Sequence, residues 1–259
     1  MKKLLSFLAL GFLLTNCGGK KDNNSTIFEF EEVGYDLIAQ WDDPDMREPG
    51  MGGGDGSFNT YGKFILPIKI NDNDITELRD SLIRLSDISI NDKGEAAPNL
   101  EGLTITGENT KMTEYSTNRT ETLSITLLNP RLIVWQNYSY EYMGGAHGYG
   151  FDTYVNYSII FNKILTLQDV LKPLFEADLN RLIRENLKWQ FDANSLLVDI
   201  NDVEYSNIFK ITPDGITFYY PPYAIAPYSA GTVEVVVSLS DLENEKLLNR
   251  EVKDQVFGI

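Results

Sequence analysis

The stretch LIVWQNYSYEYMGGAHGYGFDTYVNYSIIF, residues 132–161, decides the expected fold. Apolar and aromatic side chains alternate with polar ones over residues 132–142 and again over 151–161. An alternation with a period of two is typical of β-strands that bury one face. The glycine-rich connection between the two runs is longer than a two-residue turn. We therefore expect a β-hairpin that closes through a wide loop or a bulge.

Further strands and helices are expected on both sides of this hairpin. Short strands are predicted at residues 27–32, 35–41, 64–70, 121–128, 208–211, 216–220 and 232–237. Helices are predicted at 74–85 and 177–191, where apolar side chains recur every three to four residues. Strands grouped with a few helices, without regular β-α-β alternation, indicate an α+β fold. We expect mixed or antiparallel sheets with a few packed helices, in two α/β subdomains.

Proline, glycine and capping residues set several expected boundaries. Residues 42–59 are rich in proline, glycine and aspartate, and we interpret them as a long exposed loop. Pro67 indicates that its strand lies at a sheet edge or a bulge, because proline donates no backbone hydrogen bond. Thr166 and Asp169 have the spacing of a helix capping box. The tripeptide Pro213-Asp214-Gly215 predicts a tight turn between two strands.

The N-terminus has the pattern of a bacterial export signal. Two lysines precede an apolar run at residues 4–14, which is too short to span a bilayer as a permanent helix. The tetrapeptide Leu14-Thr-Asn-Cys17 resembles the lipobox of bacterial lipoproteins. That resemblance implies a signal peptide at 1–16, cleavage before Cys17, and attachment of acyl chains such as palmitate to this cysteine. The alternative is a simple secretory signal with an incidental cysteine.

Location and domain order follow from the same pattern. Residues 17–26 are polar, as expected for a tether between the lipid anchor and the folded part. We expect the protein to be extracytoplasmic and held by acyl chains. Gly18 occupies the position where an aspartate would resemble an inner-membrane retention signal, so the outer membrane is expected in a Gram-negative cell. The predicted folded regions are residues 27–130 and 131–250.

The composition excludes several classes of partner. The chain has 259 residues, with 38 acidic and 22 basic side chains and a formal net charge of −16. Nucleic acids and anionic lipid surfaces require clustered lysine and arginine, so neither is an expected partner. An acidic surface favours a cationic partner. The single cysteine leaves no possibility of an internal disulfide.

His147 is the only histidine in the chain and lies in the glycine-rich connection. A zinc site draws on several histidines or cysteines, so we expect no metal. No GxSxG motif supplies a serine nucleophile for this imidazole. The first interpretation is structural: His147 braces a tight turn. Gly144, Gly145 and Gly148 are expected to allow backbone torsions that other residues resist, and to let a second chain segment approach closely. Contact with a ligand and acid–base catalysis remain alternatives.

A second cluster combines proline and tyrosine over residues 216–231, ITFYYPPYAIAPYSAG. Tyrosine rings are flat and amphipathic, and they suit the binding of sugars or protein partners. The ligand-binding candidates are Tyr219, Tyr220, Tyr223 and Tyr228. The alternative is that these rings cover a sheet edge and the helix at 177–191. Asp152, Glu141 and Asp214 are nominal acid–base groups, but no spacing selects a pair, so we assign no catalytic residue.

Three ordered motifs resemble a known family. They are YMGGAHG at 142–148, LTLQDVL at 165–171 and FYYPPYAIAPYSAG at 218–231, and together they resemble the DUF3298 (RsiV-like) domain over residues 131–250. Residues 27–130 are loosely similar to the DUF4163 module. The resemblance implies an extracytoplasmic α+β module without established catalysis. Relatives include the lysozyme-sensing ectodomain of an anti-sigma factor and an accessory domain of peptidoglycan deacetylases.

The combined expectation is a lipid-anchored cell-envelope protein that binds a ligand without catalysis or a cofactor. The expected ligand is a lysozyme-like protein, peptidoglycan or another cell-wall glycan. One alternative is a hydrolase of envelope glycans or esters that uses His147 or carboxylates. A third hypothesis is a purely structural lipoprotein.

Overall fold

The computed structural model describes residues 26–42, 55–99, 117–142, 146–192 and 195–259. The chain divides into two compact units, each assembled from separate stretches. The first unit comprises Met1–Lys69, Arg79–Leu123 and Tyr138–Gly150, and the second comprises Ile70–Leu78, Ser124–Asn137 and Phe151–Ile259. The domain limits 27–130 and 131–250 stay a prediction. The signal peptide, Cys17 and most of the tether lie outside the described residues.

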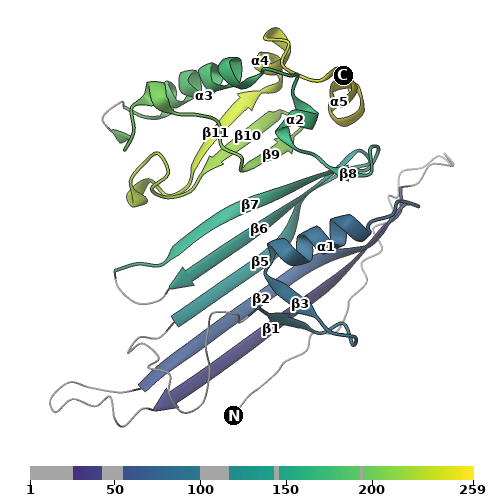
Figure 1. Cartoon of the computed structure of the whole chain (residues 1–259), viewed down its shortest axis with the longest axis vertical. Coiled ribbons are helices and arrows are strands. Elements are labelled where there is room, and N and C mark those ends of the chain that lie inside the picture. The colour runs from purple at the N-terminus through teal and green to yellow at the C-terminus, as the bar shows by residue number, and fades with distance from the viewer. Residues whose placement is uncertain (1–25, 43–54, 100–116, 143–145, 193–194) are drawn as a thin grey trace, which may run out of the picture. The chain divides into compact units, whose positions relative to one another are not determined.

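Six strands form the larger sheet, in the order β1-β2-β5-β6-β7-β8 (Figure 1). Their bounds are β1 Phe28–Asp42, β2 Asp55–Ile70, β5 Thr117–Leu128, β6 Leu132–Tyr142, β7 Tyr149–Ser158 and β8 Lys163–Ile164. β2 and β5 pair in parallel from Phe58↔Thr117 to Phe64↔Leu123. β6 and β7 are neighbours, which confirms the predicted hairpin. The connection between Tyr142 and Tyr149 is longer than a two-residue turn, as expected, and residues 143–145 of it lie outside the described part.

The N-terminal strands correct three predictions. β1 is one continuous strand rather than two, although its buried side chains change from even positions (Phe28, Phe30) to odd ones (Val33, Tyr35). β2 begins at Asp55, so residues 55–59 are extended and belong to the sheet rather than to a loop. Within the described strands, β2 lies between β1 and β5 and is no edge, despite Pro67.

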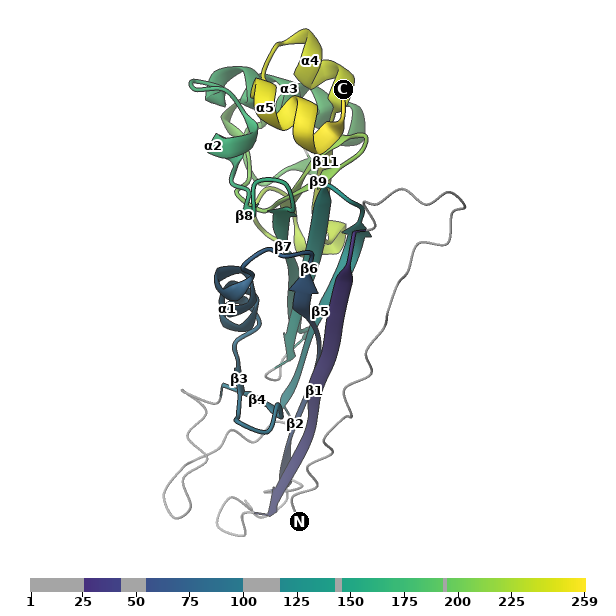
Figure 2. The ribbon, with the colours of Figure 1, turned by 90° about the vertical axis from the view of Figure 1, so that its right-hand side faces the viewer.

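Pro67 lies beyond the segment of β2 that pairs with β5, Phe58–Phe64. Its carbonyl oxygen accepts a hydrogen bond of 2.9 Å from Nη1 of Arg79, in helix α1 (Thr76–Leu85). The same guanidinium pairs with Glu31 of β1. A small hairpin of β3 (Ile88–Ile90) and β4 (Ala96–Pro98) contacts β1 (Figure 2).

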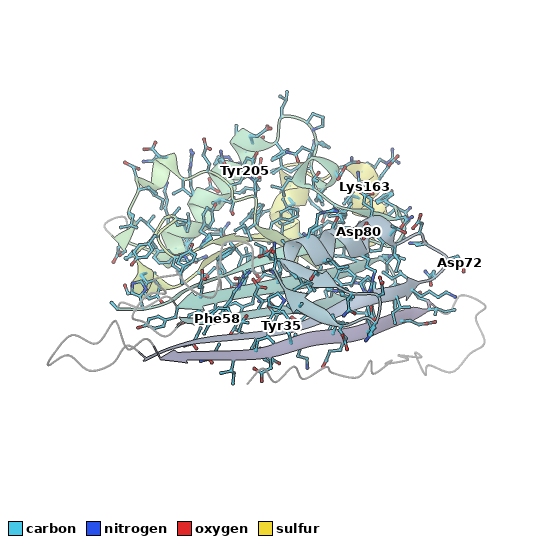
Figure 3. The ribbon with its side chains drawn as sticks, turned by 60° about the horizontal axis from the view of Figure 1, so that its bottom comes forward. Tyr35, Phe58, Asp72, Asp80, Lys163 and Tyr205 are labelled. Carbon is cyan, nitrogen blue, oxygen red and sulfur yellow. The ribbon has the colours of Figure 1, made fainter. Side chains whose placement is uncertain are left out.

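The first unit buries a set of aromatic and aliphatic side chains, of which Figure 3 labels Tyr35 and Phe58. The set comprises Phe28, Phe30, Val33, Tyr35, Phe58, Phe64, Leu66, Leu82, Ile88 and Leu123. The ring of Tyr35 lies 5.8 Å from that of Phe64 and against Gly62, where any side chain would collide with it. The glycine therefore lets an aromatic ring from the neighbouring strand lie directly on the backbone.

The second unit contains a three-stranded antiparallel sheet in the order β11-β10-β9. The strands are β9 (Phe209–Thr212), β10 (Gly215–Tyr220) and β11 (Val233–Ser238), each within one residue of its prediction. Gly215 has a φ of 141°, and a side chain there would collide with the carbonyl oxygen of Val237. This geometry confirms the predicted turn, because only glycine adopts it without strain.

Helix α3 (Glu176–Gln190) covers this sheet and contacts β11 (Figure 1). Its buried face consists of Leu179, Leu182, Ile183 and Leu187, as the helical periodicity predicts. The short helix α2 (Leu167–Val170) begins at the predicted capping box. The remaining helical segments are η3 (Ile200–Asp202), η4 (Tyr228–Ala230), α4 (Leu239–Asn244), α5 (Arg250–Val252) and the π-helical η5 (Lys253–Phe257).

Asn156 of β7 joins the three-stranded sheet to the rest of the second unit. Its Nδ2 donates to the carbonyl oxygen of Phe209 at 3.0 Å, and its Oδ1 accepts from the N–H of Ile211 at 2.7 Å. The buried amide thus satisfies both backbone groups that β9 presents on this side. The fold is α+β, as predicted. Among the described residues, no helix is both long and apolar enough to cross a membrane.

Candidate functional site

The candidate site is the connection from β10 to β11, residues 221–231, which we name the tyrosine loop. Ile225 and Ala226 anchor it, with 6% and 2% of their surface exposed. The N–H of Tyr223 donates to the carbonyl oxygen of Ala226 at 3.0 Å. The carbonyl oxygen of Ile225 accepts from the N–H of Leu197 at 2.8 Å. Buried anchors and backbone hydrogen bonds hold the loop in one conformation.

Two tyrosines of this loop present their rings at the surface. Tyr223 is 52% exposed, Tyr228 is half-buried, and their ring centroids lie 5.7 Å apart with 33° between the planes. Tyr223 has a φ of 70°, a conformation that costs a non-glycine residue about 1–3 kcal/mol. Such strain persists only where the surroundings enforce it, and it is concentrated at functional sites. The loop therefore holds an aromatic pair in which Tyr223 is strained and exposed and Tyr228 is half-buried.

The other two tyrosines correct the sequence-based site. Tyr219 and Tyr220 are 1% and 5% exposed, so a ligand at the surface does not reach their rings. The physical reason is that β10 is the central strand of its sheet and all six of its residues are buried. The hydroxyl of Tyr220 donates to the carbonyl oxygen of Glu204 at 2.7 Å. For these two residues the structural alternative is the better description.

Tyr219 instead belongs to a buried aromatic cluster. Its ring lies 4.4 Å from that of Tyr154, and Nζ of Lys210 lies 5.2 Å and 5.5 Å from the two centroids. A cation over two ring faces is attracted by their quadrupoles. Burial raises the pKa of Tyr154 to about 12, with Asp152 and Glu234 adding to the effect. The sequence did not predict this cluster, because β7, which carries Tyr154, is far in the chain from β9 and β10, which carry Lys210 and Tyr219.

His147 is exposed and belongs to the first unit, whereas the tyrosine loop belongs to the second. Its Nδ1 lies 3.0 Å from the carbonyl oxygen of Gly148, so this nitrogen carries the proton when it donates there. Gly148 is buried, and a side chain there would collide with the ring of Tyr140. Gly148 thus permits the close approach expected of it. Gly144 and Gly145 lie outside the described residues, and the role of His147 stays a prediction.

Comparison with known proteins bears on the part of the chain that includes the tyrosine loop. Residues 160–240 match the family described as "Protein of unknown function (DUF3298)". The chain contains a DUF3298 domain. This DUF3298 domain includes α3, the three-stranded sheet and the loop with Tyr223 and Tyr228. A search of curated proteins finds no match.

Two solved structures share the fold. A member of the DUF3298 family from Bacteroides fragilis is 22% identical, with 89% of this chain and 96% of that chain covered and a TM-score of 0.62. A DUF3298 family protein from Pseudomonas aeruginosa is 18% identical, with 85% and 95% covered and a TM-score of 0.54. The similarity to DUF4163 and the lipoprotein signal stay predictions.

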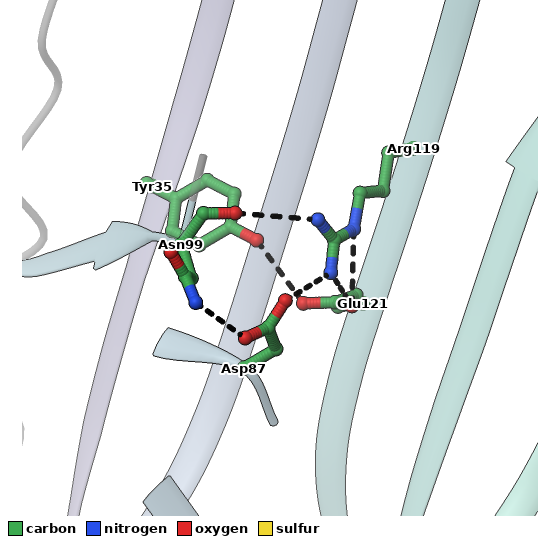
Figure 4. A network of polar contacts seen from close by, with 5 residues as sticks. All are labelled: Tyr35, Asp87, Asn99, Arg119 and Glu121. Carbon is green, nitrogen blue, oxygen red and sulfur yellow. Dashed lines mark hydrogen bonds and ion pairs between the residues drawn. The ribbon is translucent and has the colours of Figure 1, made fainter. Parts of the chain in front are cut away.

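Outside the DUF3298 domain, the first unit holds an ionic network around the buried carboxylate of Glu121 (Figure 4). Nη2 of Arg119 lies 2.6 Å from Oε1 of Glu121 and 3.0 Å from Oδ2 of Asp87. Asn99 donates to Asp87 at 3.0 Å, and the hydroxyl of Tyr35 lies 3.4 Å from Oε2 of Glu121. Burial raises the pKa of Glu121, and the hydrogen bonds and charge of Arg119 offset part of this rise.

This network joins strands rather than forming an acid–base pair. Arg119 and Glu121 are two residues apart on β5, so they lie on the same face of the strand. The guanidinium of Arg119 bridges the carboxylates of Glu121 and Asp87, so both carboxylates are paired with the same cation. The spacing of Arg119 and Glu121 is visible in the sequence. Their partners come from β1 and from the residue before β3, and these could not be located without the fold.

The remaining carboxylates form no metal site within the described ranges. No group of three or more histidine, cysteine, aspartate or glutamate side chains converges there. Asp152 accepts a hydrogen bond of 2.6 Å from Nε2 of Gln136, while Glu141 and Asp214 are exposed. The expectation that the protein needs no metal or cofactor stays a prediction.

Proposed function

We propose that the protein is a lipid-anchored component of the cell envelope that binds a protein or glycan ligand without chemical turnover. The binding surface is the ring pair of the exposed Tyr223 and the half-buried Tyr228. The observation that carries this proposal is the strained backbone of Tyr223, whose ring is 52% exposed at a φ of 70°. A strained aromatic at the surface contributes nothing to the core, so ligand contact is the better explanation of its conformation.

The chemistry of the pair fits recognition of a flat, partly apolar surface. Two adjacent tyrosine rings offer a large contact area at a low cost in conformational entropy, because each side chain has two rotatable torsions. Tyrosine hydroxyls can also exchange hydrogen bonds with a sugar or with a protein backbone. The loop is already ordered by Ile225 and Ala226, so binding does not require it to be ordered again.

The net charge narrows the class of partner. A formal charge of −16 attracts a basic protein and steers its approach. A lysozyme-like enzyme combines a basic surface with a place at the cell wall, and peptidoglycan is the matching glycan. We place the protein outside the cytoplasm, at the outer membrane of a Gram-negative cell, held by acyl chains on Cys17. Replacing Cys17 by serine is then expected to release the chain from the membrane fraction.

Retention assays with the chain from residue 18 onward test the proposed surface. Immobilised protein is exposed to a basic lysozyme and to purified peptidoglycan at low salt. Tyr223→Ala and Tyr228→Ala should each weaken retention by about tenfold or more, as expected for central aromatic contacts. This holds for whichever of the two probes, lysozyme or peptidoglycan, the unmodified chain retains. The matched control is Tyr149→Ala, which removes an exposed tyrosine from the first unit and should change nothing.

Two results would contradict the proposal. One is that neither lysozyme nor peptidoglycan is retained at low salt by the unmodified chain. The other is that retention survives when both loop tyrosines are replaced and circular dichroism shows an intact fold. Turnover of an envelope glycan or ester that disappears in His147→Ala would favour the hydrolase alternative instead.

A further inference from the structure

We propose that a pocket in the second unit binds a small monocarboxylate with an apolar body, at a site separate from the tyrosine loop. The pocket has a volume of about 330 Å³ and lies between the turn that joins β5 to β6, the end of β9 and the C-terminal helical segment. Leu127, Leu132, Ile211, Val256 and Phe257 contribute apolar side chains to its lining, and Arg131 contributes a positive charge. The inference does not rest on the proposed function.

The backbone of Arg131 is held in place by a tight turn. Oδ1 of Asn129 accepts hydrogen bonds of 2.8 Å from the N–H groups of Arg131 and Leu132. The N–H of Asn129 donates to the carbonyl oxygen of Leu132 at 3.1 Å, and the N–H of Ile159 donates to that of Arg131 at 3.0 Å. Asn129 thus closes the turn with its side chain. These hydrogen bonds fix the Cα position of Arg131 at the pocket.

Arg131 is exposed and, like Arg84, Arg184 and Arg250, it forms no ion pair with a carboxylate of the described residues. Arg79, Arg119 and Arg181 each form ion pairs with carboxylates. For Arg131, no carboxylate or other acceptor lies within bonding distance among the described residues. Its guanidinium lies against Gly258, where any side chain would collide with it. The C-terminal segment therefore leaves room for this cation without neutralising it.

The ligand class follows from the size and chemistry of the pocket. A volume of about 330 Å³ equals roughly eleven water volumes of about 30 Å³ each, so a molecule of about ten non-hydrogen atoms fits. A guanidinium binds a carboxylate through two parallel hydrogen bonds. The apolar lining favours a hydrocarbon body over a sugar. The overall negative charge opposes a more highly charged anion such as a phosphate monoester.

Titration calorimetry and amide NMR on the full chain test this site with four probes. Octanoate carries its carboxylate on a linear hydrocarbon chain, and 3-phenylpropanoate carries it on an aromatic group. Comparing the two shows whether the natural ligand is a fatty acid or an aromatic acid. The controls 1-octanol and octylamine keep the apolar body and change the charge. At least one acid is expected to bind saturably at low millimolar concentration or below. It should shift amide signals of residues 127–132, 211–213 and 256–257.

Charge recognition is tested with two arginine variants. Arg131→Gln is expected to weaken binding of the acid about tenfold or more and to leave the weaker binding of 1-octanol unchanged. The matched control Arg250→Gln, an exposed arginine on α5 that does not line the pocket, should leave both unchanged. The comparison of octanoate with 1-octanol on the unmodified chain needs no variant and remains decisive if Arg131→Gln does not fold.

The proposal is overturned if neither acid saturates, if the shifted amides lie elsewhere, or if octanoate and 1-octanol bind equally well. It is also overturned if folded Arg131→Gln binds the acid as tightly as the unmodified chain. Binding of only the linear or only the aromatic acid supports the site and identifies the source of its ligand.

Discussion

Glu121 carries a carboxylate into the interior of the first unit, where it is 3% exposed. Removing such a group from water is costly, and the pairing with Arg119 offsets that cost only while both partners are present. The hydrogen bonds of 2.6 Å and 3.1 Å between them come from Nη2 and Nε of one guanidinium. The two charges act as one unit.

Replacing Arg119 by methionine is expected to lower the free energy of unfolding by about 3–5 kcal/mol, because it leaves Glu121 buried without its cation. Urea denaturation measures the change. Adding Glu121→Leu to Arg119→Met should recover most of the loss, since the buried charge is then removed as well. If the double variant is no more stable than Arg119→Met, the pair does not act as one unit.

The matched control for this prediction is Arg181→Met. Arg181 pairs with Glu185 and Glu245, but its side chain is 42% exposed. Pairs at the surface contribute little because solvent screens them, so the expected loss is below about 1 kcal/mol. A loss as large as that of Arg119→Met would contradict the role assigned to burial.

At this scale the sequence predicted some contacts and missed others. It assigned the close approach at Gly148 correctly, because glycine is needed where a ring from a neighbouring strand touches the backbone. It could not distinguish Tyr219 from Tyr223, since proximity in sequence does not reveal which residue lies on a central strand. It also gave no sign that Lys210 would lie over two tyrosine rings, because that contact exists only once the strands are assembled.

Among the secondary-structure elements, helix α2 shows how a short segment is stabilised at its first turn. Oδ2 of Asp169 accepts hydrogen bonds from the N–H and the hydroxyl of Thr166, at 2.9 Å and 3.0 Å, and Oδ1 accepts from Nζ of Lys163 at 2.7 Å. Partial burial raises the pKa of Asp169, but the hydrogen bonds from Lys163 and Thr166 outweigh it, so the pKa lies below its ordinary 3.8. The helix is therefore stabilised by the charged form of the carboxyl.

Asp169→Ala is expected to lower the free energy of unfolding by about 1 kcal/mol at neutral pH, the usual contribution of a helix cap. Because the folded pKa is depressed, this stabilisation is present above pH 3.8 and is lost as the pH falls through the folded value. Urea denaturation over a pH series should show the gap between the two proteins closing in acid. Asp254→Ala, an exposed aspartate, should show neither effect; a gap independent of pH would contradict the assignment.

The strands and helices with strong periodicity were predicted within one or two residues. α3 and β6 are examples, because their buried faces repeat at the helical or extended period; the second hairpin strand, β7, ends three residues earlier than predicted. The errors lie where local signals were ambiguous. The change of parity in β1 suggested two strands. Pro67 suggested an edge or a bulge, although β2 lies between β1 and β5.

For the whole molecule, the dominant property is its charge of −16. The α+β class could be predicted, since it depends on the types of elements and their order. Two subdomains were predicted as well, but the segments that make up each unit could not be, because each unit takes segments from both sides of residue 130. The assembly of each unit from distant segments depends on strand pairing over long separations in sequence, as between β2 and β5. No local sequence pattern predicts such pairing.

The charge predicts a strong dependence of partner binding on salt. Raising sodium chloride from about 0.05 M to about 0.5 M shortens the screening length and should slow association with a basic lysozyme about tenfold or more. Surface plasmon resonance measures the association rate. Binding of an uncharged glycan fragment, which depends on the rings of the tyrosine loop, should change little. An association rate that is insensitive to salt would contradict electrostatic steering.

The position of β1 has a consequence for self-association. Among the described strands, β1 lies at the end of the larger sheet and carries Glu29, Glu31, Glu32 and Asp36. A strand at such a border can recruit a second molecule through its backbone, which is the first step of aggregation. Two copies that meet along β1 would bring like charges together and repel each other. Replacing these carboxylates by neutral side chains would remove that repulsion, and such variants should aggregate more readily than the unmodified protein.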